Sequence, residues 1–430
     1  MPKPNKKSRN VRPLKAKGMA TRTAILDAAH EVFKDTGYYG SSISEISRRC
    51  GISMGTFYHY FKNKEHVFLE LNDEVVARFK MRAEVSPPKD LRFRDRLRSV
   101  IRLLLDHTRG NFAFHRILGE SELIDRVTIA FYDAITQYYR DFFHREIQAG
   151  NMRHLDTDVV AYGLIGICYF SSSDWGPPHE SLSLNDMVDL ITDFALEGIS
   201  GPAPWKKYPG WNLFSLPDPI PLHPENSEPL TKGEKTRQAI LRAAGKVIGR
   251  HGINRASISE ITRDAGVAQG TFYVHFKSKS DLVIGFVRFI NHELRKKIQR
   301  VVSMTEDRRD AERVGMLAFF EFLREHREIY RVIPECEMIS REVALWYYRS
   351  LAEGYISGLE RGMGRGEIRN LPTAFVARSL MGFVHFIGLK QIVWHPDSGS
   401  EINDLFFNDM IEFALFGLRA RQVLENPFFC

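Results

Sequence analysis

Hydrogen-bond donors are concentrated in the stretch GISMGTFYHYFKNK, residues 51–64. Hydroxyl, imidazole and ammonium groups follow Gly55 here, on Thr56, Tyr58, His59, Tyr60, Lys62 and Lys64. Such groups donate hydrogen bonds to phosphate oxygens and base edges, and a glycine lets the backbone approach a phosphate closely. The chemistry that this stretch favours is therefore the binding of a nucleic acid.

The same stretch recurs as GVAQGTFYVHFKSK at residues 266–279, a shift of 215 residues. At this shift, 23 of the 44 positions in residues 21–64 are identical. The similarity continues well beyond the stretch, because Tyr132 falls on Tyr347 and, after one added residue, Gly150 falls on Gly366. A whole domain of about two hundred residues has been duplicated, which is too long a period for a solenoid.

The repeat divides the chain into two copies of one arrangement. We predict a basic N-terminal arm at 1–18, a first head at 19–64, a first helical bundle at 65–200, a linker at 201–233, a second head at 234–279 and a second bundle at 280–430. Eight prolines between Pro202 and Pro229 exclude a continuous helix in the linker. Trp205, Trp211 and Phe214 indicate that part of the linker packs on a domain surface.

Both copies are predicted to be all-α, because apolar residues recur at three- and four-residue spacing and alternating strand patterns are missing. In each copy a first apolar stripe ends at a glycine, Gly37 or Gly252. The motifs SISE at 42–45 and 257–260 then predict capping boxes, in which the serine caps the helix and the glutamate bonds back to the serine N–H.

Each capped helix is predicted to stop at a glycine, Gly51 or Gly266, and a third short helix follows over 56–60 or 271–275. This order is that of a helix-turn-helix unit, whose second helix can lie in the DNA major groove. Phe57 and Phe61, four residues apart, are expected to form the buried face of the third helix. Ordinary core packing is the alternative interpretation of the tyrosines.

The segment RTAILDAAHEVFKDTGYYGSSISEISRRCGISMGTFYHYFKNKEHVF resembles the DNA-binding region of the tetracycline-repressor (TetR) family, and the second copy resembles it equally. The resemblance implies two tandem TetR-like domains, each a three-helix head joined to a helical bundle that binds a ligand and dimerises through its last two helices. By position it implies DNA contacts from Ser42, Ser53, Gly55, Thr56, Tyr58, His59, Tyr60 and Lys64, and in the second copy from Ser257, Ala268, Gly270, Thr271, Tyr273, Val274, His275 and Lys279.

The family often has a lysine just before the glycine of the third helix, and this chain departs from that pattern. Met54 occupies the position in the first copy and Gln269 in the second. Glutamine can pair with adenine through two hydrogen bonds, whereas methionine offers apolar contact to a thymine methyl group. The heads also differ at His59/Val274 and Tyr60/His275. We therefore expect an asymmetric operator in double-stranded DNA, with half-sites roughly one helical turn apart.

Two segments in each copy are candidates for pairing: residues 156–170 and 185–199 in the first, 372–389 and 403–418 in the second. Their small and aromatic residues suit a four-helix interface, although packing inside each copy explains the same composition. We favour an intramolecular pseudo-dimer over a symmetric dimer of chains that presents four heads, and a higher oligomer is left open.

Aromatic residues are dense in the central helices of both bundles and predict a cavity for an apolar small-molecule effector. The candidate ligand-binding residues are Phe112, Tyr132, Tyr139, Tyr162, Trp346, Tyr347, Tyr355 and His385. The alternative is that these aromatic residues are only core, in a DNA-binding scaffold without an effector. With an effector, the expected function is a ligand-responsive regulator, a repressor by the family's usual outcome, with activation left open.

Composition is consistent with a soluble regulator. The 430 residues carry a net charge of +7, and seven basic residues without an acid lie among the first seventeen. The four scattered cysteines imply neither a disulfide framework nor a metal site, and the interpretation needs no cofactor. No nucleotide loop, metal-spaced cluster or nucleophile elbow indicates an enzyme. We expect a cytoplasmic, nucleoid-associated protein with no membrane span.

Overall fold

The computed structural model describes residues 16–85, 87, 90–111, 122–172, 182–206, 231–327, 332–333, 336–337, 339–394 and 402–419. The chain divides into two compact units, residues 1–77 and 78–430. Within the described residues all regular structure is helical, apart from one isolated bridge between Ser200 and Ile368. The apolar spacing of the sequence predicts this all-α class. Most of the basic arm and residues 207–230 of the linker, with Trp211 and Phe214, lie outside the described residues.

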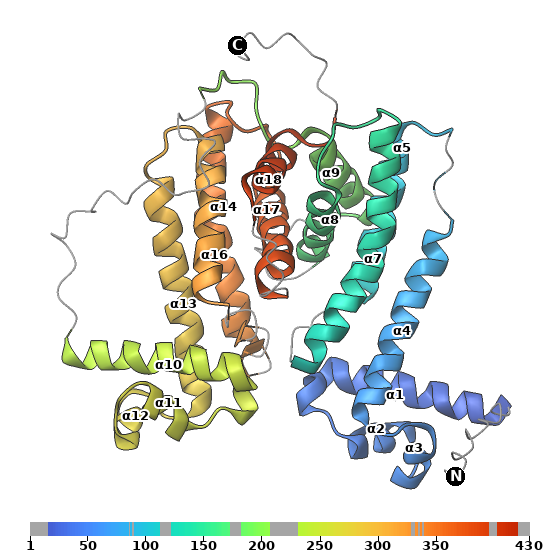
Figure 1. Ribbon diagram of the computed structural model, residues 1–430, viewed down its shortest axis with the longest axis vertical. Coiled ribbons are helices and arrows are strands. Elements are labelled where there is room, and N and C mark those ends of the chain that lie inside the picture. Colours follow the sequence, from blue (N-terminus) through green and yellow to red (C-terminus); the bar gives the residue numbers. More distant parts are fainter. Residues whose placement is uncertain are drawn as a thin grey trace, which may run out of the picture. The chain divides into compact units, whose positions relative to one another are not determined.

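The first unit is a three-helix head followed by the greater part of a long fourth helix (Figure 1). Its helices are α1 (Ala16–Gly40), α2 (Ile43–Cys50), α3 (Met54–Tyr60) and α4 (Lys64–Ala83). The predicted stripe of α1 is buried, and the helical backbone is interrupted at Gly37, where φ is 72°. A left-handed φ is inexpensive only for glycine, so Gly37 ends the regular part of α1 as its position predicts.

The serine caps form in both heads, but the predicted capping boxes are only half formed. Ser42 Oγ accepts the N–H of Glu45, and Ser257 Oγ accepts that of Glu260, each at 3.2 Å. Neither carboxylate returns to its cap in these described turns: Glu45 accepts two bonds from Arg48, at 2.8 and 2.6 Å, and Glu260 pairs with His251 at 3.1 Å. The reciprocal part of the prediction is wrong because a nearby side chain, Arg48 or His251, competes for each glutamate.

The second unit contains the remaining bundle of the first copy and the whole of the second copy. Its helices are α5 (Phe93–Gly110), α7 (Glu122–Gln148), α8 (Thr157–Ser172), α9 (Leu184–Glu197), α10 (Lys232–Arg255), α11 (Ile258–Asp264), α12 (Gln269–His275), α13 (Lys279–Val302), α14 (Arg308–Glu325), α16 (Arg341–Gly364), α17 (Thr373–Gly388), the π-helix η2 (Leu389–Val393) and α18 (Asp404–Phe416). Helices α10, α11 and α12 form the second head, and α10 packs against α13, which leads into the bundle (Figure 1).

Burial shows how the two copies correspond. α5 and α14 have bounds that differ by 215 residues, but the buried positions of α7 recur in α16 at a shift of 216. The added residue therefore lies before α16, and Tyr132 corresponds to Tyr348, not to Tyr347 as the ungapped alignment predicts. The reason is mechanical, since an insertion inside a continuous helix would rotate every later side chain by about 100°.

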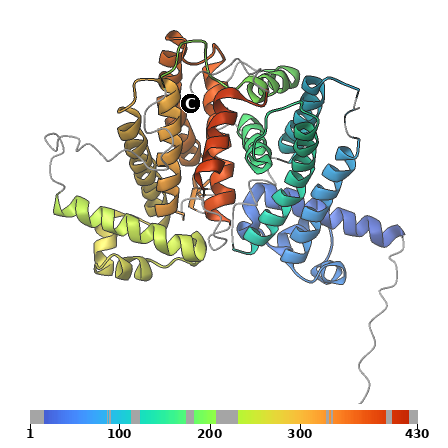
Figure 2. The ribbon, with the colours of Figure 1, turned by 45° about the horizontal axis from the view of Figure 1, so that its top comes forward.

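The two copies meet where α8 crosses α17, in the centre of the second unit (Figures 1 and 2). Gly166 and Gly382, which correspond at the shift of 216, lie directly against each other. A Cβ atom on either residue would overlap the carbonyl oxygen of the other. The helices can approach this closely only because neither residue has a side chain.

The ends of α9 and α18 repeat this reciprocity through backbone hydrogen bonds. Ile199 N–H donates to Ala414 O at 3.1 Å, and Leu418 N–H donates to Ala195 O at 2.8 Å. Two ion pairs flank the contact in matching positions, Arg369 with Asp193 at 3.0 Å and Arg153 with Glu412. These hydrogen bonds and ion pairs from the first copy to the second thus have counterparts in the opposite direction, which is the pattern of an isologous, two-fold interface.

The described beginning of the linker packs on the second copy, as its aromatic residues predict. Gly201 N–H donates to Glu367 O at 2.8 Å, and the Trp205 ring lies 5.1 Å from the Arg309 guanidinium. A cation over a tryptophan face is attracted by the quadrupole of the ring, so Trp205 holds this part of the linker in place.

Among the residues that the structure describes, one helical stretch, Thr373–Val393, is long and apolar enough to cross a membrane, whereas the sequence predicts no such span. In the most apolar window of this stretch, 61% is buried inside the protein. α17 forms most of the stretch and packs against α8 and α16, so its position in the core accounts for its composition.

We expect Gly382→Ala to lower the free energy of unfolding by about 1–3 kcal/mol, because the added methyl group forces α17 away from α8. Urea denaturation followed by circular dichroism measures the change. Gly364→Ala is the matched control, since a Cβ atom at Gly364 would meet no atom within 4 Å. Equal stability of the two variants would contradict the close crossing of the helices.

Candidate nucleic-acid interface and effector cavity

The third helix of each head has one buried face and one exposed face. Phe57 and Phe61 are 0% and 1% exposed, as their spacing predicts, and Phe272 and Phe276 repeat this burial in α12. Tyr58, in contrast, is 52% exposed and Tyr273 is 57% exposed. The two tyrosines therefore present their rings at the surface of the heads and do not belong to the core.

The positions at which the two heads differ lie on or beside this exposed face. Met54 is 47% exposed and Val274 is 78% exposed. His59 and Gln269 are also exposed, whereas Tyr60 and His275 are half-buried. A change at these positions alters the surface that a head presents and leaves its core untouched.

The start of the third helix is capped in one head only. Ser53 Oγ accepts the N–H of Thr56 at 3.1 Å and lies 2.9 Å from the Thr56 hydroxyl. In the second head Ala268 occupies the cap position and has no side chain for this bond, so Thr271 lacks such a neighbour. N–H groups in a first helical turn need an acceptor from outside the helix. In α12 the Thr271 N–H donates instead to the backbone carbonyl oxygen of Ala268 at 2.9 Å, so the two heads satisfy this N–H in different ways.

Glycine at positions 55 and 270 is not required by the packing of the heads. A Cβ atom on Gly55 would meet only Ser53 Oγ, at 3.7 Å, and one on Gly270 would meet no atom within 4 Å. Glycine in a helix costs roughly 0.5–1 kcal/mol relative to alanine. The reason for keeping a bare backbone here lies outside the chain's own contacts, as expected where a helix must approach a phosphate closely.

Each of the two lysines predicted to contact DNA also makes hydrogen bonds within its own head. Lys64 Nζ donates to the carbonyl oxygen of Ser41 at 2.9 Å and to that of Tyr38, and it lies 4.4 Å from the Tyr38 ring centre. Lys279 Nζ donates to Ala256 O at 3.1 Å in the second head. Both lysines join the loop before the second helix to the start of the fourth. Their contact with DNA stays a prediction.

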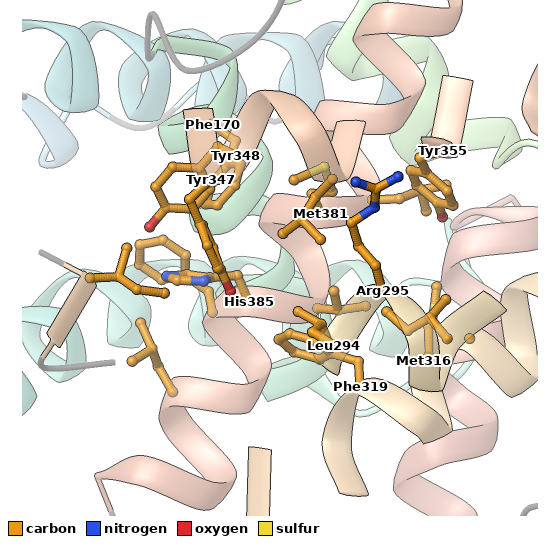
Figure 3. A pocket seen from close by; sticks show the side chains of 18 of the residues that line it. Phe170, Leu294, Arg295, Met316, Phe319, Tyr347, Tyr348, Tyr355, Met381 and His385 are labelled. Atoms are coloured by element: carbon orange, nitrogen blue, oxygen red, sulfur yellow. The ribbon is translucent and has the colours of Figure 1, made fainter. Parts of the chain in front are cut away.

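A cavity of about 290 Å³ lies inside the second unit (Figure 3). Helices α13, α14, α16 and α17 of the second copy form most of its wall. The remaining wall residues are Ile333, Glu337, Leu389, Val393 and Trp394 of the second copy and Thr128, Tyr132, Tyr169 and Phe170 of the first. Of the predicted ligand-binding residues, the cavity brings together Tyr132, Tyr347, Tyr355 and His385.

The other predicted ligand-binding residues lie elsewhere. Tyr139 is fully buried in the first bundle and its hydroxyl donates to Val100 O at 3.1 Å. Tyr162 donates to Asp133 at 2.7 Å, and Trp346 is 39% exposed on the outer side of α16. Phe112 lies outside the described residues.

Sequence reasoning missed most of the cavity wall. The missed apolar members include Leu294, Ile298, Met316, Phe319, Met381 and Trp394. Trp394 follows the π-turn η2 and stacks on Tyr132 with ring centres 5.2 Å apart. The only sequence signal for this wall is apolar spacing, which does not separate a cavity wall from a filled core.

A buried polar group closes part of the cavity. Arg308 Nε donates to Glu312 Oε1 at 2.7 Å, and the Tyr355 hydroxyl donates to the other carboxylate oxygen. The Arg308 guanidinium also lies 5.0 Å from the Tyr355 ring centre. Burial raises the pKa of Tyr355 well above its usual value, so its hydroxyl stays protonated and donates. Arg308 and Glu312 satisfy each other in this cluster and present little net charge to the cavity.

Arg295 of α13 is a further charged residue in the wall. Its guanidinium points toward the cavity beside Tyr355 in Figure 3. No hydrogen-bond or ion-pair partner for Arg295 is found among the residues that the structure describes. It can therefore supply a positive charge to an anionic group at the edge of an otherwise apolar space.

His385 lines the cavity as a neutral ring. Burial lowers the pKa of His385 to about 3, and its ring centre lies 5.2 Å from that of Phe170. At neutral pH the imidazole is uncharged. His385 therefore adds no charge to the cavity wall.

Comparison with known proteins finds the family model described as "Bacterial regulatory proteins, tetR family" at two places, residues 25–71 and 240–285. The chain is 21% identical to the uncharacterized HTH-type transcriptional regulator YhgD of Bacillus subtilis over 181 residues, which are 41% of this chain and 95% of that protein. It is 38% identical to the fatty acid metabolism regulator protein of the same species over 77 residues, which are 18% of this chain and 40% of that protein.

Among solved structures, the chain is similar to FadR of Bacillus subtilis in complex with stearoyl-CoA. The identity is 21%, the match covers 40% of this chain and 96% of that chain, and the TM-score is 0.36.

We expect Gly270→Ala to stabilise the fold by about 0.5–1 kcal/mol, because alanine favours the helix and the new methyl group meets no atom of the chain. The same methyl group should weaken DNA binding by about tenfold, or 1.4 kcal/mol, if the backbone lies against a phosphate. Thermal denaturation and titration of a bound duplex measure the two effects. Stabilisation without loss of DNA affinity would contradict a close approach at Gly270.

A second expectation concerns His385 and pH. Its pKa is about 3 in the folded protein and about 6.5 in an unfolded chain, so the unfolded state binds the proton more readily. The stability that neutral His385 preserves is complete above pH 6.5 and is lost as the pH falls toward 3, by at most about 1.4 kcal/mol per pH unit. His385→Gln should flatten this part of the stability profile, measured by urea denaturation at pH 7, 6 and 5. Parallel profiles for the two proteins would contradict the prediction.

Proposed function

Because the chain belongs to the tetR family of bacterial regulatory proteins and carries two TetR-type domains in tandem, we propose that it is a ligand-responsive repressor whose two unequal heads read one asymmetric operator. It is a transcriptional regulator and not an enzyme. The observation that carries the proposal is the reciprocal contact between the two bundles of a single chain, combined with reading faces that differ at exposed positions.

The reciprocal contacts favour an intramolecular pseudo-dimer. α8 pairs with α17 and α9 pairs with α18 inside one chain, so each copy covers the pairing surface of the other. A homodimer of this family would need a second chain for these contacts. One chain that already makes them has no equivalent surface left for a second, which favours two heads per molecule over four.

Residues that are identical in the two heads and residues that differ have different roles in DNA recognition. The shared Gly-Thr-Phe-Tyr segments at 55–58 and 270–273 form the third helix and bind backbone phosphates whatever the DNA sequence. The pairs Met54/Gln269 and His59/Val274 present different groups to the base edges. Two heads of this kind select two different half-sites.

The cavity favours a sensor over a scaffold that lacks an effector. Its wall is mainly apolar, and Arg295 offers one positive charge among the described wall residues that is not already paired. We propose an amphiphilic effector with a long apolar chain inside the cavity and an acidic group at Arg295. The printed name of one relative, a fatty acid metabolism regulator, agrees with this chemical class.

α13 links the cavity to the second head. The helix begins at Lys279, directly after the third helix of that head, and carries Leu294, Arg295 and Ile298 in the cavity wall. A ligand that binds better to one position of α13 favours that position over the others. In the proposed mechanism, this position of α13 moves the second head so that its third helix no longer fits the major groove. The protein then dissociates from the DNA.

Selection of operators from random duplexes by the purified chain tests the proposal. We expect a best site whose two halves differ, bound by one chain per duplex in analytical ultracentrifugation. The matched control is the triple variant Met54→Gln, His59→Val, Tyr60→His, which gives the first head the letters of the second and should shift the best site toward a palindrome. Long-chain acyl compounds should weaken the wild-type complex by tenfold or more. A perfect palindrome as the best wild-type site would contradict the asymmetric operator, and an acyl series without effect would contradict the effector.

A further inference from the structure

We infer that the chain binds one effector and not two: the second copy holds the ligand, and the first copy has filled the equivalent space with its own side chains. This inference rests on the proposed function for the role of the ligand. It adds which half senses, and how many molecules each chain takes.

Equivalent positions of the two bundles differ consistently in burial. Val100, Leu104, Ile135, Tyr139 and Ile165 of the first copy correspond to Gly315, Phe319, Leu351, Tyr355 and Met381 of the second. All five first-copy residues are at most 1% exposed. All five second-copy residues are partly accessible and line the cavity. The same face of the bundle is therefore closed in one copy and open in the other.

Two glycines of the second copy stand where the first copy has larger side chains. Gly315 stands where the first copy has Val100, and Gly354 stands where it has Tyr138. A Cβ atom on Gly354 would meet no atom within 4 Å, and one on Gly315 would meet only Val302, at 3.7 Å. Gly315 is half-buried and Gly354 is exposed, and the missing side chains at these two positions leave space at the cavity wall.

In the first copy the corresponding space holds an aromatic cluster. Phe79, which replaces Leu294, lies 6.0 Å from Tyr138, 6.2 Å from Tyr139 and 5.0 Å from His107 between ring centres. The Tyr139 hydroxyl is satisfied by the Val100 carbonyl at 3.1 Å. Among the described residues of the first bundle, ring contacts at these distances are those of a filled core.

The buried ion pair of the cavity wall also occurs in only one copy. Arg308 and Glu312, which form the buried pair beside Tyr355, correspond to Phe93 and Leu97 in the first copy. Leu97 is fully buried, so the first copy has apolar packing where the second has a hydrogen-bonded cluster. Shape and polarity thus agree that the ligand-binding chemistry belongs to the second copy.

The first copy still takes part as a wall. Tyr132 contacts Phe386 and stacks on Trp394, with ring centres 5.3 and 5.2 Å apart, and Lys390 pairs with Asp133 at 3.2 Å. A ligand in the second copy therefore touches residues of both halves. Its effect acts directly on the contact between them and needs no second site.

Stoichiometry tests the inference on the full chain. A dansyl-labelled long-chain fatty acid, followed by fluorescence and by native mass spectrometry, should bind once per chain. Gly354→Tyr gives the cavity the side chain of the first copy and should weaken binding at least tenfold. Gly364→Tyr is the matched control on the same helix, because Gly364 also faces open space but lies outside the cavity wall, and its binding should equal that of the wild type.

DNA affinity separates the possible failures. Gly354→Tyr protein should bind operator DNA as tightly as the wild type and should not release it on addition of the fatty acid. Gly315→Val is the second variant, with the same expected loss of fatty-acid binding, should the tyrosine prevent folding. Two molecules bound per chain, or undiminished binding by these variants, would overturn the single site while leaving the regulator intact. No binding to the wild type would overturn this inference and the proposed effector together.

Discussion

The backbone contact between Gly166 and Gly382 is the constraint on which the arrangement of the second unit depends. Two helices can cross at this distance only where neither carries a side chain, and the two residues are each other's counterparts in the repeat. The crossing sets the position of α8 against α17, and with it the reciprocal hydrogen bonds of Ile199 and Leu418. It also brings residues of the first copy to the edge of the cavity in the second.

Duplication within one chain removes a restriction that symmetry imposes on homodimers. A substitution in a homodimer appears in both subunits, so neither the DNA-binding head nor the bundle core can change in one subunit alone. Here each copy has its own codons for every position. Met54 differs from Gln269 in the heads, and Tyr138 differs from Gly354 in the bundles, without disturbing the glycine crossing between them. The two halves can therefore specialise while their pairing stays two-fold.

Local patterns made much of the fold predictable from sequence. Helical spacing gave the all-α class, Gly37 and Gly51 marked ends, and Phe57 followed from its four-residue spacing to Phe61. The aromatic residues predict a cavity, but its location and most of its wall were not predictable, because they depend on small residues on facing helices, such as Gly315 and Gly354, whose proximity no linear pattern reveals. Two predictions failed for related reasons, that of complete capping boxes and that of an ungapped alignment up to α16. Each outcome depends on a tertiary neighbour or on burial and not on the motif itself.

A single sensing half is sufficient for control if both heads bind one operator. Joining two binding modules makes the second contact intramolecular, so that the pair binds about 10²–10⁴ times more tightly than one module alone. An effector that displaces only α13 removes one head from its half-site and thereby forfeits this gain. In that mechanism the first copy needs no ligand, because its contribution is the fixed partner against which the second moves. The filled core around Tyr139 suits that role, since a close-packed interior transmits displacement and does not absorb it.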